Sequence, residues 1–226
     1  MCGRYNIITD AKALYDAYQV EAELGGAALA RYNAAPATEQ LVIVGEGGKR
    51  AARWHRWGLI PHWAKDQTIG YKTINARGES VASKPAFRAA LRQRRCLVPA
   101  TGFYEWKLTN GGKQPYLIRL KSGGLFSFAG LWEIWNGPEG EVRSFSIITT
   151  APNELMARIH DRMPTILPRE SYARWLDPEL RDPAEIQPMI ASYPAIELEA
   201  VPVSRKINNA RNQGAELIEP VGAPLE

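Results

Sequence analysis

Short apolar segments separated by glycine-rich turns fill the middle of the chain, and this pattern limits the fold more than any other feature of the sequence. The turn signals are Asn110-Gly111-Gly112, which is a strong hairpin signal, and Ser122-Gly123-Gly124. The apolar segments between and around these turns predict strands at residues 97–98, 102–108, 116–120, 125–132 and 144–149. Short strands joined by tight turns predict a mainly antiparallel sheet.

The flanking regions add two strands and several short helices. Residues 41–44 and 51–57 alternate or are β-branched, and they predict two strands joined by a turn over 45–48, whereas residues 31–36 are expected to be irregular. Capping residues and apolar spacing predict a helix after Asp10, with Leu14, Tyr15 and Tyr18 on its apolar side. The same signals predict helices over 83–94, 153–160, 171–176 and 184–192. A strand over 198–203 is expected to follow the last of these helices. No repeat or long linker divides the chain, so we expect one α+β domain over 1–226, with a curved, mainly antiparallel sheet and peripheral helices.

Composition narrows the functional classes. The chain has 226 residues, 45% hydrophobic and 23% charged, and its net charge of +4 favours acidic partners over basic ones. Two cysteines do not make a disulfide framework, and Cys96 in its apolar strand is expected to be a buried, inert thiol, which indicates a reducing compartment. The sequence shows no secretion signal and no apolar run that could cross a membrane, so a cytoplasmic monomer without a membrane association is expected. Three histidines without zinc-site spacing predict no metal site, and no cofactor is expected.

The start of the chain, Met1-Cys2-Gly3-Arg4-Tyr5, is chemically distinctive. If Met1 is removed, Cys2 carries an α-amine and a thiol on adjacent carbons, and both groups are partly deprotonated near neutral pH. Such a 1,2-aminothiol can act as an amine-assisted nucleophile, or it can condense with an aldehyde and close a five-membered thiazolidine ring. The alternative is that Cys2 has no function and merely follows the start of translation.

Other polar residues are open to a structural and a functional interpretation. Asn75 is either a turn residue bonded to its own backbone or an amide that orients an amine or a sugar oxygen, and Arg77 would then suit a phosphate. Glu105 is either a surface partner of Lys107 or, because Phe103 shares its strand face, a desolvated general acid or base.

Three further features have the same two interpretations. His160 either caps a helix C-terminus or shuttles protons. The polar run over 203–217 and the arginine clusters at 88–95 and 205–211 are solvated surface or bind a nucleic-acid backbone. Trp57 is expected in the core, and an exposed Trp63 would stack on unpaired bases.

Seven motifs in order resemble the SOS response-associated peptidase (SRAP) family over residues 2–217. They are Met-Cys-Gly-Arg-Tyr at 1–5, Arg-Tyr-Asn-x-Ala-Pro at 31–36, Trp-Gly-Leu-x-Pro-x-Trp at 57–63, Asn-Ala-Arg-x-Glu at 75–79, Gly-Phe-Tyr-Glu-Trp at 102–106, Ile-His-Asp-Arg-Met-Pro at 159–164, and Val-Ser…Asn-Gln-Gly-Ala-Glu-Leu ending at 217. The resemblance implies a protein that recognises abasic sites in single-stranded DNA and at junctions with duplex DNA. It also implies a thiazolidine DNA–protein crosslink through Cys2, Schiff-base (AP lyase-type) chemistry and autoproteolytic removal of Met1. Such a protein would be cytoplasmic, and associated with the nucleoid when bound to DNA.

The resemblance also assigns roles to residues. Cys2 would be the nucleophile, Asn75 would hold the α-amine or the opened sugar, and Glu105 and His160 would move protons. Positions that would contact DNA or shape its groove are Arg4, Asn33, Pro36, Trp63, Arg77, Lys84 and Arg162, with Arg88 as a further phosphate candidate.

Three other functions fit the start of the chain. An N-terminal-nucleophile amidohydrolase also uses a terminal cysteine, but it would need an amide substrate and an oxyanion hole. A non-catalytic DNA-binding module and a peptidase acting on other proteins are the remaining alternatives.

Overall fold

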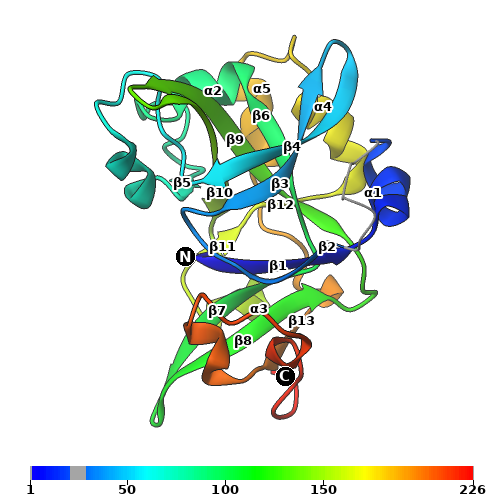
Figure 1. The fold of residues 1–226 in the computed structure, drawn as a ribbon. Helices are drawn as coiled ribbons and strands as arrows, with labels where there is room; N and C mark the ends of the chain where they lie inside the picture. Colours follow the sequence, from blue (N-terminus) through cyan, green and yellow to red (C-terminus); the bar gives the residue numbers. More distant parts are fainter. Residues whose placement is uncertain (1, 21–28, 226) are drawn as a thin grey trace.

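The computed structural model describes residues 2–20 and 29–225, whose strands form two sheets with short helices around them (Figure 1). The first sheet has five strands in the order β13-β8-β7-β1-β2, and all its pairs are antiparallel. Its strands are β1 (Arg4–Thr9), β2 (Leu29–Ala34), β7 (Gly102–Thr109), β8 (Gly112–Leu120) and β13 (Leu198–Pro202). In Figure 1 this sheet occupies the lower half of the molecule, with β1 along its upper border.

The second sheet has eight strands and closes on itself. Its strands are β3 (Glu39–Glu46), β4 (Lys49–Trp57), β5 (Asn75–Arg77), β6 (Arg95–Ala100), β9 (Phe126–Gly137), β10 (Gly140–Thr150), β11 (Met163–Pro164) and β12 (Ile166–Leu167). Pairing between β9 and β10 completes the ring β10-β4-β3-β6-β9, which is a small barrel. Strand β10 pairs in parallel with β4 and β5, so the sheet is mainly but not entirely antiparallel.

The helices are short and lie at the periphery (Figure 1). The α-helices are α1 (Ala11–Tyr18), α2 (Arg88–Gln93), α3 (Glu154–Ala157), α4 (Tyr172–Leu176) and α5 (Pro183–Ile186). The 3-10 segments are η1 (Gln67–Lys72), η2 (Arg169–Ser171), η3 (Gln187–Met189), η4 (Ala195–Glu197), η5 (Arg205–Asn208) and η6 (Ala215–Leu217). Within the described ranges no helix is long and apolar enough to cross a membrane.

Aromatic side chains from both sheets share one core. Tyr5 of β1 packs edge-on against Trp57 of β4, with ring centroids 5.2 Å apart, and against Phe128 of β9, at 5.8 Å. Phe103 of β7 contacts the same Phe128 ring at 5.9 Å. Because Tyr5 is fully buried, these contacts fix the start of β1 against the barrel.

One histidine belongs to this buried interior. His55 of β4 is 1% exposed, lies directly opposite Gln40 of β3, and packs against Trp132 with ring centroids 5.2 Å apart. Neither ring nitrogen has a hydrogen-bond partner among the described residues. Burial, followed by the charges of Arg143 and Arg53, lowers the pKa of His55 to about 4, so the ring is neutral at pH 7.

Many of the predicted elements are confirmed. The α+β class and the predicted strands are present, and Trp57 and Cys96 are buried. The predicted hairpin is also present, with its turn at Asn110-Gly111 and with Gly112 at φ +94°. Asp10 and Asn153 cap α1 and α3 through their side chains, as predicted.

Several boundaries and one segment were predicted wrongly. Residues 31–36 are not irregular, since 31–34 belong to β2 and pair with β1. The helix predicted from Ser83 begins only at Arg88, because the preceding residues form successive turns that start at Ser80. Helix α5 passes into a 3-10 segment at Gln187, where Pro188 cannot donate a helical hydrogen bond. Helix α3 ends at Ala157 and so falls short of 160, and Tyr15 of α1 is half exposed instead of packed.

Candidate active site

Cys2 and Asn75 meet where the two sheets come together. Cys2 lies two residues before β1 and is fully buried, and its carbonyl oxygen accepts a hydrogen bond of 2.8 Å from Asn75 Nδ2. Asn75 begins β5, whose parallel pairing with β10 fixes its position. Asn75 is therefore a strand residue rather than the turn residue of the structural interpretation. Its Oδ1 is buried and has no hydrogen-bond partner among the described residues, so it can accept a hydrogen bond from a group that enters the site.

The negative charge of Glu105 acts on the thiol of Cys2. The β1–β7 register pairs Arg4 with Tyr104, and its continuation places Glu105 beside the residue that follows Cys2. Burial, and after it the charge of Glu105, raises the pKa of the Cys2 thiol well above its ordinary value. Glu105 itself is only 5% exposed, so it is not a surface partner of Lys107, and the buried Phe103 lies on the same strand face as predicted. The thiol is protonated at neutral pH and needs a base before it can react.

His160 lies on the loop between α3 and β11. Its main-chain N–H donates to Met156 O at 2.8 Å and so ends the last turn after α3. Nδ1 of its ring accepts a hydrogen bond of 3.0 Å from the main-chain N–H of Arg162. The carboxylate of Asp161 lies 2.9 Å from the same Nδ1.

The side chain of Arg162 ties this loop to the strands that carry Asn75. The guanidinium of Arg162 forms a two-point ion pair with Glu79, at 2.5 and 2.9 Å, and donates to Thr149 O of β10 at 2.7 Å. Thr149 in turn pairs with Arg77 of β5, two residues after Asn75. His160 is thus connected to the Asn75 strand through Arg162 and β10.

Arg162 is predicted to contact a phosphate, and its guanidinium already has partners within the protein. Its side chain is only 15% exposed, and the ion pair with Glu79 occupies both terminal nitrogens. A phosphate could contact Arg162 only by displacing Glu79.

Arg4 and Asn33 form a second connected group. Arg4 Nη1 donates to Asn33 Oδ1 at 3.1 Å and to Ile207 O at 3.0 Å, and burial lowers the pKa of Arg4. Asn33 Nδ2 donates to the carbonyl oxygens of Ile207, Asn209 and Asn212. Asn33 is buried, with 1% of its surface exposed. It fixes the segment over 205–213 against β2 and so shapes the neighbouring surface.

The remaining predicted DNA contacts lie at the surface or in turns. Trp63 is 51% exposed, Arg77 and Lys84 are exposed, and Pro36 is half-buried in the turn after β2. The loop that carries Trp63 is held by a close approach of two glycines. A Cβ atom on Gly58, which has φ +120°, would lie 2.5 Å from Gly70 O, so only glycine fits there.

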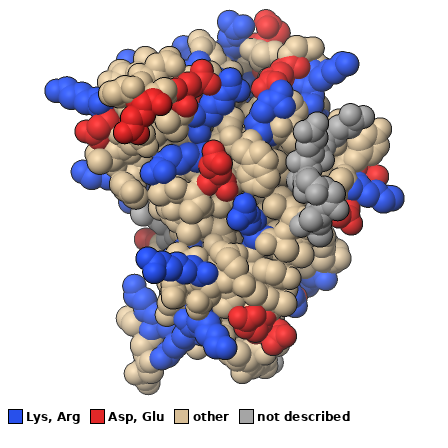
Figure 2. Space-filling model, in the orientation of Figure 1, with Lys and Arg blue, Asp and Glu red and all other residues tan. Residues whose placement is uncertain are grey.

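Basic side chains gather next to this region. Figure 2 shows Lys and Arg over the lower part of the face drawn in Figure 1, where β7, β8 and the C-terminal 3-10 segments lie. Arg205, Lys206 and Arg211 of the segment fixed by Asn33 are all exposed. In the cluster over 88–95, by contrast, Arg95 is buried and donates to Trp175 O and Leu91 O, so it is structural and not part of a solvated face.

Sequence reasoning missed two residues of these networks, Glu79 and Gln213. Glu79 pairs with Arg162, and the side-chain amide of Gln213 bonds both the N–H and the C=O of Asn33, at 3.1 and 2.9 Å. Both residues stand inside the motifs that carried the resemblance, Asn-Ala-Arg-x-Glu and Asn-Gln-Gly. Their presence in those motifs was the available signal, but nothing in the sequence indicated their partners.

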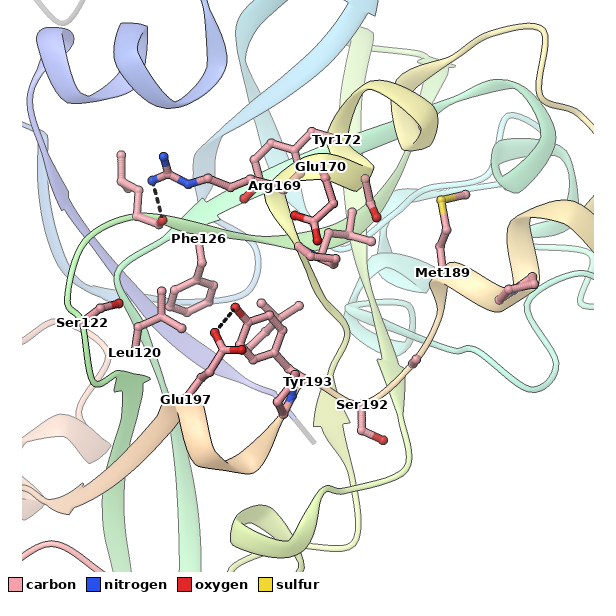
Figure 3. Close-up of a pocket in the computed structure, with 18 of the residues that line it drawn as sticks. Leu120, Ser122, Phe126, Arg169, Glu170, Tyr172, Met189, Ser192, Tyr193 and Glu197 are labelled. Atoms are coloured by element: carbon pink, nitrogen blue, oxygen red, sulfur yellow. Dashed lines mark hydrogen bonds between the residues drawn. The ribbon is translucent and has the colours of Figure 1, made fainter.

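A large pocket of about 770 Å³ lies elsewhere, between β9, η2 and the chain over 188–197 (Figure 3). Tyr193 donates to Glu197 at 2.9 Å across one side of it. None of the predicted site residues lines this pocket, so the candidate active site lies outside it.

Residues 1–210 match the sequence model of a protein family described as SOS response associated peptidase (SRAP). The chain is 46% identical over 222 residues to "Abasic site processing protein YoqW" of Bacillus subtilis, covering 97% of this chain and 99% of that protein. It is 33% identical over 198 residues to "Abasic site processing protein HMCES" of Gallus gallus, covering 76% of this chain and 58% of that protein. A crystal structure of a protein from Bacteroides thetaiotaomicron superimposes with a TM-score of 0.86 at 27% identity, over 97% of this chain and all of that one.

Proposed function

The chain belongs to the SOS response associated peptidase (SRAP) family, and on that premise we propose that it processes abasic sites in single-stranded DNA, including sites at junctions with duplex, by a covalent crosslink through Cys2. The observation that carries the proposal is the hydrogen bond between Asn75 Nδ2 and the Cys2 carbonyl, together with the charge of Glu105 beside the thiol. Residues from three motifs that are distant in the sequence therefore meet at Cys2, the one residue that can become a 1,2-aminothiol. The relatives named abasic site processing proteins support the same substrate.

The reaction begins with hydrolysis of the Met1–Cys2 peptide bond, which releases the α-amine of Cys2. That amine adds to the aldehyde carbon of the ring-opened abasic sugar, and loss of water leaves a C=N bond. The thiol then adds to the C=N carbon, and its proton passes to the nitrogen. The product is a thiazolidine, and the overall condensation releases one water molecule.

Each site residue has a role in this sequence. Asn75 holds the Cys2 backbone through Nδ2, and its unpaired Oδ1 accepts a hydrogen bond from the α-amine. Glu105 takes the proton of the thiol, whose raised pKa keeps it protonated until a base acts. His160 gives a proton to the sugar oxygen during ring opening and to the hydroxyl that leaves as water.

Single-stranded DNA suits the surroundings of this site. The exposed Trp63 offers a face for stacking, and Arg77 and Lys84 offer charge for phosphates. The basic side chains of the segment fixed by Asn33 extend that charge (Figure 2). We propose a protein that binds DNA as a monomer and reads the lesion and the backbone rather than a base sequence.

The test is incubation of the purified protein with an oligonucleotide that carries one abasic site, followed by denaturing electrophoresis. Wild type should give a heat-stable band of reduced mobility, and Cys2→Ala should lose it while still binding the oligonucleotide without a crosslink. Cys96→Ala is the matched control, because Cys96 is the other buried free thiol of the described chain and lies in β6. It should crosslink like wild type.

A heat-stable band from Cys2→Ala would refute the role of Cys2. Glutamine hydrolysis or cleavage of other proteins by wild type, without a crosslink, would favour an amidohydrolase or a peptidase instead. In the same assay, Glu105→Gln and His160→Ala should slow crosslinking by roughly 10²–10⁴-fold, the usual contribution of a positioned acid or base. Wild-type rates for both would remove them from the mechanism.

A further inference from the structure

Two groups compete for one ring nitrogen of His160. The N–H of Arg162 donates to Nδ1 at 3.0 Å, which requires a lone pair on that nitrogen. The carboxylate of Asp161, 2.9 Å from Nδ1, can pair with it only when that nitrogen carries a hydrogen. The two contacts therefore belong to different protonation states of the ring. With Arg162 as donor the neutral ring carries its hydrogen on Nε2, whereas Asp161 stabilises a hydrogen on Nδ1.

The main chain of Arg162 is held in place by its own side chain. Glu79 binds both terminal nitrogens of the guanidinium, and Thr149 O binds one of them at 2.7 Å. A two-point pair fixes orientation as well as distance. Asp161, by comparison, has a side chain that is 90% exposed, so water competes for its carboxylate. The resting balance favours the Arg162 contact.

We propose that Glu79 is a positioning residue for His160. Through the Arg162 side chain it holds the Arg162 N–H on Nδ1, and so it fixes the neutral ring as the tautomer with its hydrogen on Nε2. This inference rests on the proposed function for its catalytic meaning. The tautomer itself is a property of the free protein.

The consequence for the reaction is a defined path for the proton. The neutral ring offers its Nε2–H as a hydrogen-bond donor to the substrate. When Nδ1 takes up a proton from solvent, Asp161 accepts the new hydrogen bond and the Arg162 N–H is released. The Nε2 proton can then pass to the leaving oxygen, which leaves a neutral ring with its hydrogen on Nδ1. Loss of that hydrogen and protonation of Nε2 restore the resting state.

Several charged groups surround this loop. Asp161 and Arg162 belong to it, Arg158 ends the preceding helix, and Glu79 and Arg77 face it from the β5 side. Glu105 is the further ionisable group in the proposed chemistry. A change at Glu79 alters the net charge near His160 as well as the geometry, so the decisive measurement is the tautomer and not the charge state.

The experiment is long-range ¹H–¹⁵N NMR of the three histidines in uniformly labelled protein, with the His160 signals assigned by their loss in His160→Ala. Wild type should show neutral His160 with its hydrogen on Nε2. In Glu79→Gln, which keeps the size of the side chain but loses the charged two-point pair, the ratio of the two neutral tautomers should move roughly tenfold toward Nδ1–H, and crosslinking should slow. Glu46→Gln is the matched control, because Glu46 forms a two-point pair with Arg53 on the β3–β4 hairpin. It should leave both readouts unchanged.

Asp161→Asn provides a second variant with a different expected result. It should keep the Nε2–H tautomer, because the Arg162 N–H and the Glu79 pair that holds it are unchanged. A wild-type tautomer ratio in a folded Glu79→Gln, or a shift toward Nδ1–H in Asp161→Asn, would overturn the inference. If the NMR results are as expected but wild type forms no crosslink, the proposed function fails while the role of Glu79 in fixing the ring stands.

Discussion

Lowering the pH should destabilise the barrel through His55, and the structure gives the size of the effect. The imidazole is 1% exposed, and its nitrogens have no hydrogen-bond partner in the described part of the chain, so a proton on the ring would be a buried, unpaired charge. The pKa of His55 is about 4 in the fold against 6.5 for an ordinary histidine. The unfolded chain therefore binds the proton more readily, and stability contributed by the neutral ring is complete above pH 6.5 and is lost as the pH falls toward 4.

The magnitude follows from proton linkage. When the pH falls from 7 to 5, the weaker proton binding of the folded state lowers the free energy of unfolding by about 2 kcal/mol. A fall from pH 7 to pH 4 lowers it by about 3 kcal/mol. A loss of about 2 kcal/mol is a large fraction of the ~5–15 kcal/mol that stabilises a typical domain.

The assay is urea unfolding followed by tryptophan fluorescence at pH 7 and pH 5, for wild type and for His55→Gln. The variant will lose packing against Trp132 at both pH values, so the informative quantity is the change in unfolding free energy between them. That change should be smaller by about 2 kcal/mol in His55→Gln than in wild type. Equal pH responses of wild type and His55→Gln would refute the reasoning.

Four further predictions concern packing around the site. Gly58→Ala should cost about 1–3 kcal/mol, because the added Cβ meets Gly70 O and the backbone is left-handed, and a thermal unfolding midpoint equal to wild type would contradict this. Asn33→Ala leaves three carbonyl oxygens and the Arg4 side chain without their shared partner, so stability should fall by about 2–3 kcal/mol, and trypsin should cut at Arg205, Lys206 or Arg211 faster than in wild type. Tyr5→Phe removes a buried hydroxyl that has no partner among the described residues and should change stability by less than about 1 kcal/mol. Tyr104→Phe, which breaks hydrogen bonds to Asn6 and Tyr32, should destabilise by about 1–2 kcal/mol in the same urea titration.

Local signals in the sequence predicted local structure. The hairpin after Leu108 depends on residues that touch each other along the chain, and so do the caps at Asp10 and Asn153. Strand β2 was missed because its strand geometry comes from pairing with β1, and the segment itself carries no β-branched run. The closure of the barrel was missed for the same reason, since it depends on the long-range parallel pairing of β10 with β4 in addition to the β9–β10 hairpin.

The candidate site shows the same difference between what local sequence indicates and what depends on residues far apart in the chain. The residue types at Cys2, Asn75 and Glu105 indicated their chemistry, and the structure connects them. The ion pair of Arg162 was not predicted, because its partner, Glu79, stands 83 positions away and nothing in the sequence pairs the two. A free arginine and an arginine held in an ion pair look alike in a sequence.

The amide of Gln213 has a consequence for how molecules of this protein behave toward one another. Strand β2 is the outer strand of the first sheet, and an outer strand offers unpaired N–H and C=O groups to any extended chain that approaches. At Asn33 both groups are already bonded to Gln213, so one side-chain amide takes the place that a strand from another molecule would occupy. Loss of that amide would open a template for intermolecular β-pairing beside the proposed DNA-binding surface, and the first sign would be self-association in concentrated solution.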